Sequence, residues 1–209
     1  IVDLEYSALP FESVVSNITN FYKEFAVESH KNNLKLSALI YGDVFVRPRP
    51  YDVPAISKSV DQIYVMAYDF HKASGNPGPN FPLDGNVAYG YDFKTMTRDF
   101  LKAVTINKIS VIFGLYGYDW TVDEKDQSVG LAASASTYFY ENKFLPACTL
   151  KNCKVGRNEL SAETEASYVD GDDQKHIVWF EDEKSMKEKK KYLHSVGIRA
   201  FGVWAYSYY

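Results

Sequence analysis

The stretch Val60–His71, which reads VDQIYVMAYDFH, decides the fold prediction. From Ile63 to Tyr68 every residue is apolar or aromatic, so the stretch has no polar face. Such a run predicts a strand that is covered on both sides, as in a parallel sheet. It ends in Asp69 and His71, before a Gly/Pro-rich loop, and parallel barrels build active sites from strand ends of this kind. The alternative is a core strand whose Asp69 only caps the next turn.

The composition indicates one domain or a large part of one, because the chain has 209 residues and is 46% hydrophobic. The net charge is −4, and the only long basic run, Lys187–Lys191, is interpreted as the solvated face of a helix. Binding to nucleic acid or to a membrane surface therefore has no support. No apolar run reaches the roughly 18 residues of a membrane span, and we expect no signal peptide within these residues. The chain begins at Ile1, inside an apolar strand and without Met, which we interpret as a truncation.

Strand and helix patterns alternate along the chain. Strands are expected at residues 1–6, 34–41, 60–69, 108–116 and 200–205, and helices at residues 11–25, 54–59, 91–104 and 183–194. The stripe of the first helix contains Ile18, Phe21, Tyr22 and Phe25, and Asp182 is the expected N-cap of the last helix. Between Trp120 and Lys175 the rhythm breaks: a helix is expected at 131–142, and two short strands at 166–169 and 176–180.

This alternation predicts an α/β protein made of parallel βα units. Five strands are too few for a closed barrel of eight, so we expect the C-terminal five units of a (β/α)8 TIM barrel. The last gap is long enough for a small α+β insertion, at about residues 121–176, between the final two strands. Residues 1–209 would then be a partial catalytic domain, with about 90 residues absent before Ile1. A doubly wound sheet is the alternative, but no Gly-rich phosphate loop follows any strand.

Functional side chains are expected to gather where these strands end. Asp3 and Glu5 lie two residues apart on one strand, so both point to the same face. Two neighbouring carboxylates raise each other's pKa, and a carboxyl kept protonated is what a general acid requires. Aromatic residues, which make up 16% of the chain, supply flat apolar platforms for sugar rings. Together these features indicate glycoside cleavage.

Four ordered motifs resemble those of glycoside hydrolase family 18, the chitinase family. IVDLEY resembles the end of the family's D-x-x-D-x-D-x-E motif, and MAYD (Met66–Asp69) resembles its M-x-Y-D motif. VWA around Trp204 is similar to the last-strand tryptophan. LYGYDW (Leu115–Trp120) and HIVWFED (His176–Asp182) resemble the bacterial spore-germination and cell-wall glycosidases. The resemblance implies a (β/α)8 barrel, often with a small α+β insertion after the seventh strand.

The resemblance also implies roles for individual residues. Glu5 would be the general acid and base, and Asp3 would orient the substrate's N-acetyl group. Tyr68 would hydrogen-bond the acetamido oxygen, Asp69 would fix the substrate, and Trp204 would stack under the sugar. The further candidates for substrate binding are Met66, Tyr41, Tyr116, Tyr118 and Trp120, the last four of which have core positions as the alternative. The family's earlier Asp residues are absent from this chain.

The two cysteines, Cys148 and Cys153, are too few for a zinc site, so we expect a small disulfide between them. A disulfide favours an oxidising location, either secreted or at the cell surface or cell wall. The four histidines are scattered, and neither a metal nor another cofactor is expected.

The expected partner is a β-1,4-linked N-acetylglucosamine polymer or oligomer, bound by a monomer. The first functional hypothesis is a retaining, substrate-assisted glycosidase acting on chitin. Its alternatives are a peptidoglycan or spore-cortex N-acetylglucosaminidase and a non-catalytic chitinase-like lectin. Fold alone does not separate these functions.

Overall fold

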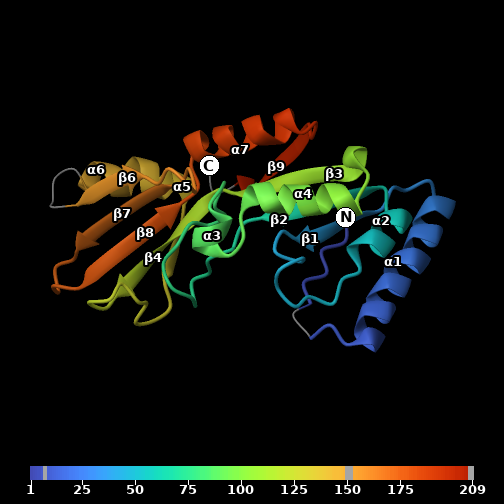
Figure 1. Cartoon of the computed structure of the whole chain (residues 1–209), viewed down its shortest axis with the longest axis horizontal. Helices are drawn as coiled ribbons and strands as arrows, with labels where there is room; N and C mark the ends of the chain where they lie inside the picture. Colours follow the sequence, from blue (N-terminus) through green and yellow to red (C-terminus); the bar gives the residue numbers. More distant parts are fainter. Residues whose placement is uncertain (7–8, 149–152, 207–209) are drawn as a thin grey trace.

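The computed structural model describes residues 1–6, 9–148 and 153–206. In this part of the chain the strands form two sheets, which lie next to each other along the long axis of the molecule (Figure 1). The first is a four-stranded parallel sheet in the order β1-β2-β3-β9, and the second is a five-stranded antiparallel sheet in the order β5-β4-β8-β7-β6. The chain is therefore an α/β protein with one parallel sheet.

The parallel sheet has the expected central strand. It contains β1 (Ser37–Tyr41), β2 (Gln62–Ala67), β3 (Ile109–Gly114) and β9 (Ala200–Trp204). Val65, Met66 and Ala67 are consecutive and all buried, as predicted for a strand covered on both faces. The register places Tyr41 beside Met66, and Gly114 beside Trp204, so the strands end along one edge of the sheet.

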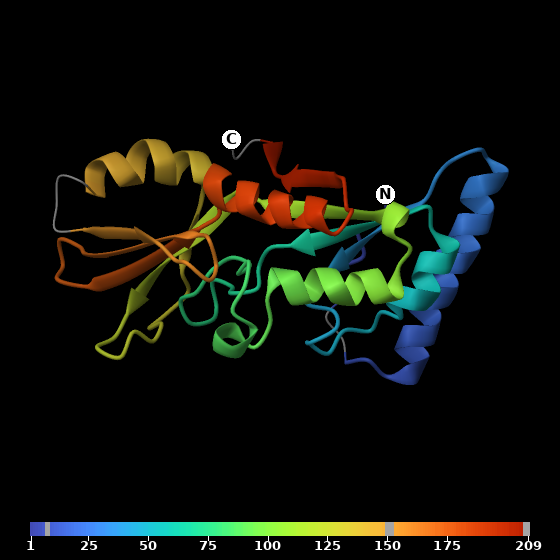
Figure 2. The same ribbon diagram turned by 45° about the horizontal axis from the view of Figure 1, so that its top comes forward.

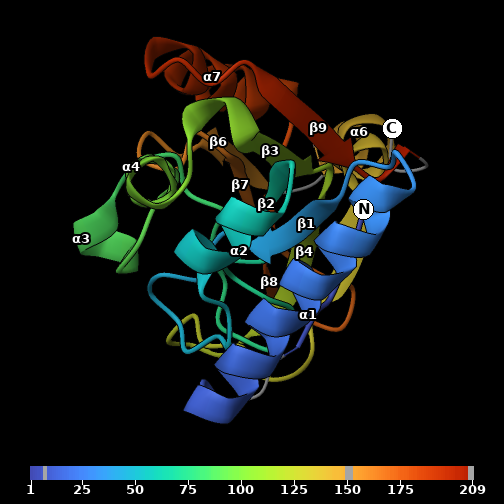
Figure 3. The same cartoon turned by 90° about the vertical axis from the view of Figure 1, so that its right-hand side faces the viewer.

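Four helices lie side by side along the parallel sheet (Figure 3). They are α1 (Glu12–Lys31), α2 (Val53–Ser59), α4 (Phe93–Ala103) and α7 (Glu183–Ser195). A short 3-10 helix, η1 (Ile106–Lys108), precedes β3, and a single helical turn, α3 (Asn86–Tyr89), precedes α4. Asp182 caps α7 with a capping box, as expected, and Gly197, with φ +90°, follows its end.

Two predictions about helix faces are wrong. Phe21 and Phe25 stack on each other and remain 44% and 42% exposed, because α1 buries the narrower stripe that contains Ile18 and Tyr22. Lys189 is fully buried rather than solvated, because it occupies the buried stripe of α7 four residues after Ser185 and four before Leu193.

The N-terminal segment is less regular than predicted. Val2 forms one parallel bridge with Ala38, and its amide donates to the Ser37 carbonyl oxygen over 2.8 Å. Beyond this bridge, residues 1–6 form no strand. The expected fifth strand is therefore a single point of pairing beside β1.

The antiparallel sheet occupies the sequence between β3 and α7. Its strands are β4 (Tyr116–Val122), β5 (Ala133–Ser136), β6 (Lys154–Arg157), β7 (Thr164–Val169) and β8 (Lys175–Phe180). Helical turns cover one side: α5 (Thr137–Phe139), the π-helical η2 (Tyr140–Phe144) and α6 (Leu145–Cys148), seen at the far end from α1 in Figure 2. The two short strands predicted at residues 166–169 and 176–180 are confirmed as β7 and β8.

Two predictions in this region are corrected. Leu115–Trp120 does not simply end the preceding strand: from Tyr116 it is a new strand that pairs with β8 of the other sheet. Gly117 permits this pairing, because a Cβ there would lie 2.1 Å from the Trp179 carbonyl oxygen. The helix predicted from residue 131 begins only at Thr137, because Ala133–Ser136 pairs with β4.

Candidate active site

A cleft opens where the strands of the parallel sheet end. Five predicted residues line it together: Glu5, Tyr41, Met66, Tyr68 and Asp69. Gly42, Asp43, Arg49 and Lys72 complete the lining. Residues that lie far apart in the sequence therefore share one small pocket, as predicted from the common direction of the strands.

Glu5 reaches this cleft from the N-terminal segment, which Tyr51 holds in place. The Tyr51 hydroxyl donates to the Leu4 carbonyl oxygen and accepts from the Tyr6 amide at 2.8 Å. These contacts flank Glu5 on both sides. Tyr51 was not predicted, because nothing in its local sequence links it to a segment 45 residues earlier.

Two cleft tyrosines are held protonated. Burial, followed by the charges of Glu5 and Asp3, raises the pKa of Tyr68. Burial, together with the charge and a hydrogen bond of Glu5, raises the pKa of Tyr41. Both phenols therefore stay protonated well above neutral pH and can donate hydrogen bonds in the cleft.

Asp69 has an unusual backbone conformation, with φ +58°. Its amide donates to Asn80 Oδ1 at 2.7 Å, and the next amide, that of Phe70, donates to the Asn80 carbonyl oxygen at 2.7 Å. A non-glycine residue in this region of φ persists where its surroundings fix it, and such positions concentrate at functional sites. Asn80 is the residue that fixes it here.

The side chain of Asp69 accepts two phenolic hydrogen bonds on one oxygen. Tyr116 and Tyr118 both donate to Oδ1, Tyr118 over 2.7 Å. Burial and the Asp69 charge raise the pKa of Tyr116, which keeps it a donor. The two tyrosines, predicted as sugar contacts, are each only 8% exposed, and their hydroxyls hold the catalytic candidate Asp69.

Trp120 and Trp204 have opposite environments. Trp120 is fully buried among the aromatic residues of the second sheet, so it offers no surface to a ligand and its prediction as a sugar contact is corrected. Trp204 is 51% exposed at the end of β9, and its carbonyl oxygen accepts from the Leu115 amide at 2.7 Å. Trp204 is therefore accessible at the edge of the sheet where the strands end, although it does not line the pocket that contains Glu5 and Asp69.

Sequence reasoning did not predict that the positively charged Arg49 lines the cleft. Arg49 donates to both carboxylate oxygens of the buried Asp43, at 2.9 and 3.1 Å, and its guanidinium lies 3.8 Å from the centre of the Tyr41 ring. Bidentate pairs of this kind fix an arginine in one orientation. No pattern in the sequence linked Arg49 to Tyr41.

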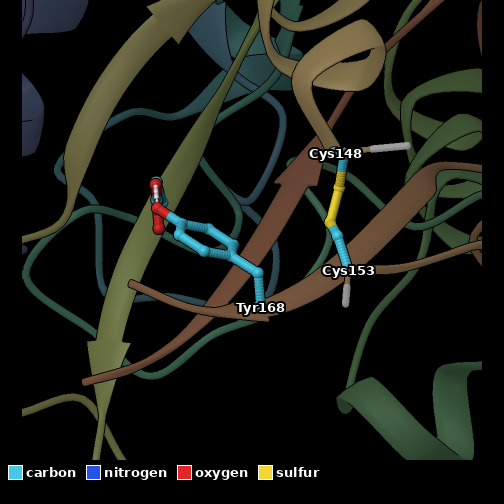
Figure 4. Close-up of a disulfide and its surroundings, with 4 residues drawn as sticks. Cys148, Cys153 and Tyr168 are labelled. Carbon is cyan, nitrogen blue, oxygen red and sulfur yellow. Dashed lines mark hydrogen bonds between the residues drawn. A yellow bond between two sulfur atoms is a disulfide. The ribbon is translucent and has the colours of Figure 1, made fainter. Parts of the chain in front are cut away.

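Cys148 and Cys153 are bonded to each other at the end of α6, and their Cα atoms are 5.2 Å apart (Figure 4). Among the described residues, no cluster of three or more His, Cys, Asp or Glu side chains could hold a metal ion. Within the same ranges, no helix has the length and apolar character needed to cross a membrane.

Comparison with known proteins agrees with this geometry. A sequence model of the glycosyl hydrolases family 18 matches residues 2–208. The chain belongs to this family.

Three relatives illustrate the likeness. The uncharacterized glycosylase YvbX of Bacillus subtilis is 32% identical over 156 residues, which are 75% of this chain and 41% of YvbX. Chitotriosidase-1 of Mus musculus is 26% identical over 209 residues, 93% of this chain and 44% of that protein. The crystal structure of the sporulation-specific glycosylase YdhD of Bacillus subtilis superposes with a TM-score of 0.79 at 22% identity, covering 96% of this chain and 63% of that one. The chain spans less than half the length of the two curated relatives, YvbX and chitotriosidase-1.

Proposed function

We propose that the protein carrying this chain hydrolyses β-1,4-linked N-acetylglucosamine polymers, with retention of anomeric configuration. The observation that carries the proposal is the cleft in which Glu5, Tyr68 and Asp69 come together. Family membership supports glycosidase chemistry in general terms. We also propose that the parallel sheet is the C-terminal part of a (β/α)8 barrel, with the antiparallel sheet as its insertion.

The proposed reaction uses the substrate as its own nucleophile, a mechanism known among exceptions to the two-carboxylate scheme. Glu5 donates its proton to the glycosidic oxygen while the acetamido oxygen of the sugar on the non-reducing side attacks the anomeric carbon. The carbon–oxygen bond to the leaving sugar breaks, and a cyclic oxazolinium ion forms. The Glu5 carboxylate then takes a proton from water, which opens the ring from the original face.

The other candidate residues prepare this attack. The protonated Tyr68 hydroxyl donates to the acetamido oxygen, Asp3 orients the acetamido group, and Asp69 fixes the substrate. Intramolecular attack in a fixed geometry lowers the barrier by proximity and orientation. Asp3 lies on the same segment as Glu5, two residues away, so it cannot readily approach the anomeric carbon from the opposite face.

The test is product stereochemistry. NMR of freshly formed product from an N-acetylglucosamine oligomer should show retained configuration, and fully deacetylated oligomers should bind without being cleaved. Inverted product, or cleavage of the deacetylated oligomer at a comparable rate, would refute the assignment of Asp3 and Tyr68.

Peptidoglycan is the second candidate substrate. It is favoured by the likeness to YdhD, whose name marks it as a sporulation-specific glycosylase, whereas chitotriosidase-1 favours chitin. Comparing turnover of chitin oligomers with that of purified peptidoglycan decides between them.

A non-catalytic lectin would bind these sugars without turnover. A secreted or cell-wall location is proposed on the strength of the disulfide.

A further inference from the structure

A buried ion cluster lies beneath the loop that follows Asp69. Lys189 of α7 donates to Glu163 at 2.8 Å and also to Glu181, and all three side chains are at most 1% exposed. Among the described residues this cluster therefore combines two carboxylates with one ammonium in a site closed to solvent. Buried charges of this kind need specific partners, and the partners of the two carboxylates differ.

Glu163 binds the backbone of the loop. Its two oxygens accept from consecutive amides, from Asn80 at 2.6 Å and from Phe81 at 2.9 Å. Among the residues that the structure describes, Glu181 makes no such contact with the loop: its second oxygen accepts from the Ser185 hydroxyl of α7 at 2.5 Å. Within the cluster, it is Glu163 that connects to the loop.

Asn80 transmits this contact to the cleft. Its side chain accepts from the Asp69 amide, its carbonyl oxygen accepts from the Phe70 amide, and its side-chain amide donates to the Tyr116 carbonyl oxygen at 3.3 Å. Asp69 is thus held in its left-handed conformation by a residue that Glu163 holds in turn. The adjoining loops reinforce the contact, since the amides of residues 83 and 84 donate to the carbonyl oxygens of residues 161 and 160.

We propose that Glu163 is a positioning residue for Asp69, acting through Asn80 from outside the cleft. The role of Lys189 is to balance its charge. The effect of losing Glu163 on turnover rests on the proposed function of Asp69. Its effect on the order of the loop backbone does not.

Glu163→Gln and Glu181→Gln form a matched pair of variants. Each removes one of the two carboxylates and leaves Lys189 paired with the other, so the cluster becomes a neutral ion pair in both. The side chain introduced by Glu163→Gln has one acceptor oxygen for two backbone amides, whereas Glu181→Gln leaves the loop contacts intact. The comparison separates loop positioning from the general effect of altering a buried cluster.

Hydrogen exchange in the full protein tests the backbone step. In Glu163→Gln, the amides of Asp69, Asn80 and Phe81 should exchange about tenfold faster than in the wild type, while Glu181→Gln leaves them protected. Equal exchange in the two variants would overturn the proposal. This measurement needs no substrate, so it remains decisive even where the wild type cleaves no N-acetylglucosamine polymer and the proposed function fails.

Kinetics tests the functional step. Glu163→Gln should lower kcat about tenfold with KM nearly unchanged, and Glu181→Gln should retain wild-type kinetics. Because Glu163 acts through Asn80, Glu163→Gln combined with Asn80→Ala should cost no more than the larger single loss. Losses that multiply, or that are the same for Glu163→Gln and Glu181→Gln, would overturn the proposal. If Glu163→Gln does not fold, Glu163→Asp, which keeps the charge but shortens the reach to the amides, is judged by the same measurements.

Discussion

The hydroxyl of Tyr118 donates a hydrogen bond of 2.7 Å to Oδ1 of Asp69, a residue 49 positions earlier in the chain. Tyr118 belongs to the antiparallel sheet, and Asp69 follows the central strand of the parallel sheet. The second sheet therefore supplies part of the cleft's hydrogen-bond network. The antiparallel sheet is therefore part of the site.

Tyr118→Phe should lower kcat/KM about tenfold, because a hydrogen bond to a charged acceptor contributes about 1.5–3 kcal/mol and Tyr116 still donates to the same oxygen. Steady-state kinetics on an N-acetylglucosamine oligomer measures the loss. Tyr138→Phe, at a tyrosine that is 51% exposed, is the control and should change nothing. Equal activity of the two variants would mean that Tyr118 only packs.

Glu5→Gln should abolish turnover and leave saccharide binding nearly intact, since the substitution keeps the shape and removes the transferable proton. Turnover above about a tenth of the wild-type rate would exclude Glu5 as the acid. Glu12→Gln, at the exposed first turn of α1, controls for the loss of one negative charge.

Trp204→Ala should weaken oligosaccharide binding by about 1–3 kcal/mol, because a stacked aromatic ring and its burial contribute about that much. Calorimetric titration on the Glu5→Gln background measures the change without turnover. Phe201→Ala is the control: Phe201 lies three residues earlier on β9, so it points to the opposite face of the strand. Unchanged affinity in Trp204→Ala would leave Trp204 without a role in binding.

Cys148 and Cys153 should be bonded to each other in the purified protein, as they are in the structure. Mass spectrometry after alkylation without reduction should find neither thiol modified. Two alkylated thiols would remove the main support for a secreted or cell-wall location.

Stability should depend on pH through Glu181. Burial raises the pKa of Glu181 from its ordinary value of 4.5 to about 7, so the folded state binds a proton more tightly than the unfolded state does. The stabilising contribution is complete below pH 4.5 and is lost as the pH rises through 7. Over this window the free energy of unfolding of the wild type should fall by on the order of 3 kcal/mol relative to that of Glu181→Gln, measured by denaturant titration. A constant difference between the two proteins would contradict the assignment.

The sequence by itself determined the parallel strand–helix units and most of the cleft. A continuous apolar run indicates a strand covered on both faces, and Ile63–Ala67 lies in the largely buried strand β2. Strands that run in parallel bring their ends to one edge, so residues at the ends of separate predicted strands, such as Glu5, Tyr41 and Asp69, were predictable neighbours. The motifs identified the family because their order and spacing are local properties of the chain.

Only the tertiary structure decided which partners the buried polar side chains contact. Tyr116 and Tyr118 were predicted as sugar contacts, and in β4 their hydroxyls donate to Asp69. Lys189 was predicted to face water, and it lies fully buried between Glu163 and Glu181. The physical reason is that local periodicity specifies which face of an element is apolar, whereas the partner of a buried polar group depends on contacts between distant segments. The Glu163 carboxylate accepts a hydrogen bond from the Asn80 amide, 83 residues earlier in the sequence, and a local sequence pattern cannot predict a contact over that separation.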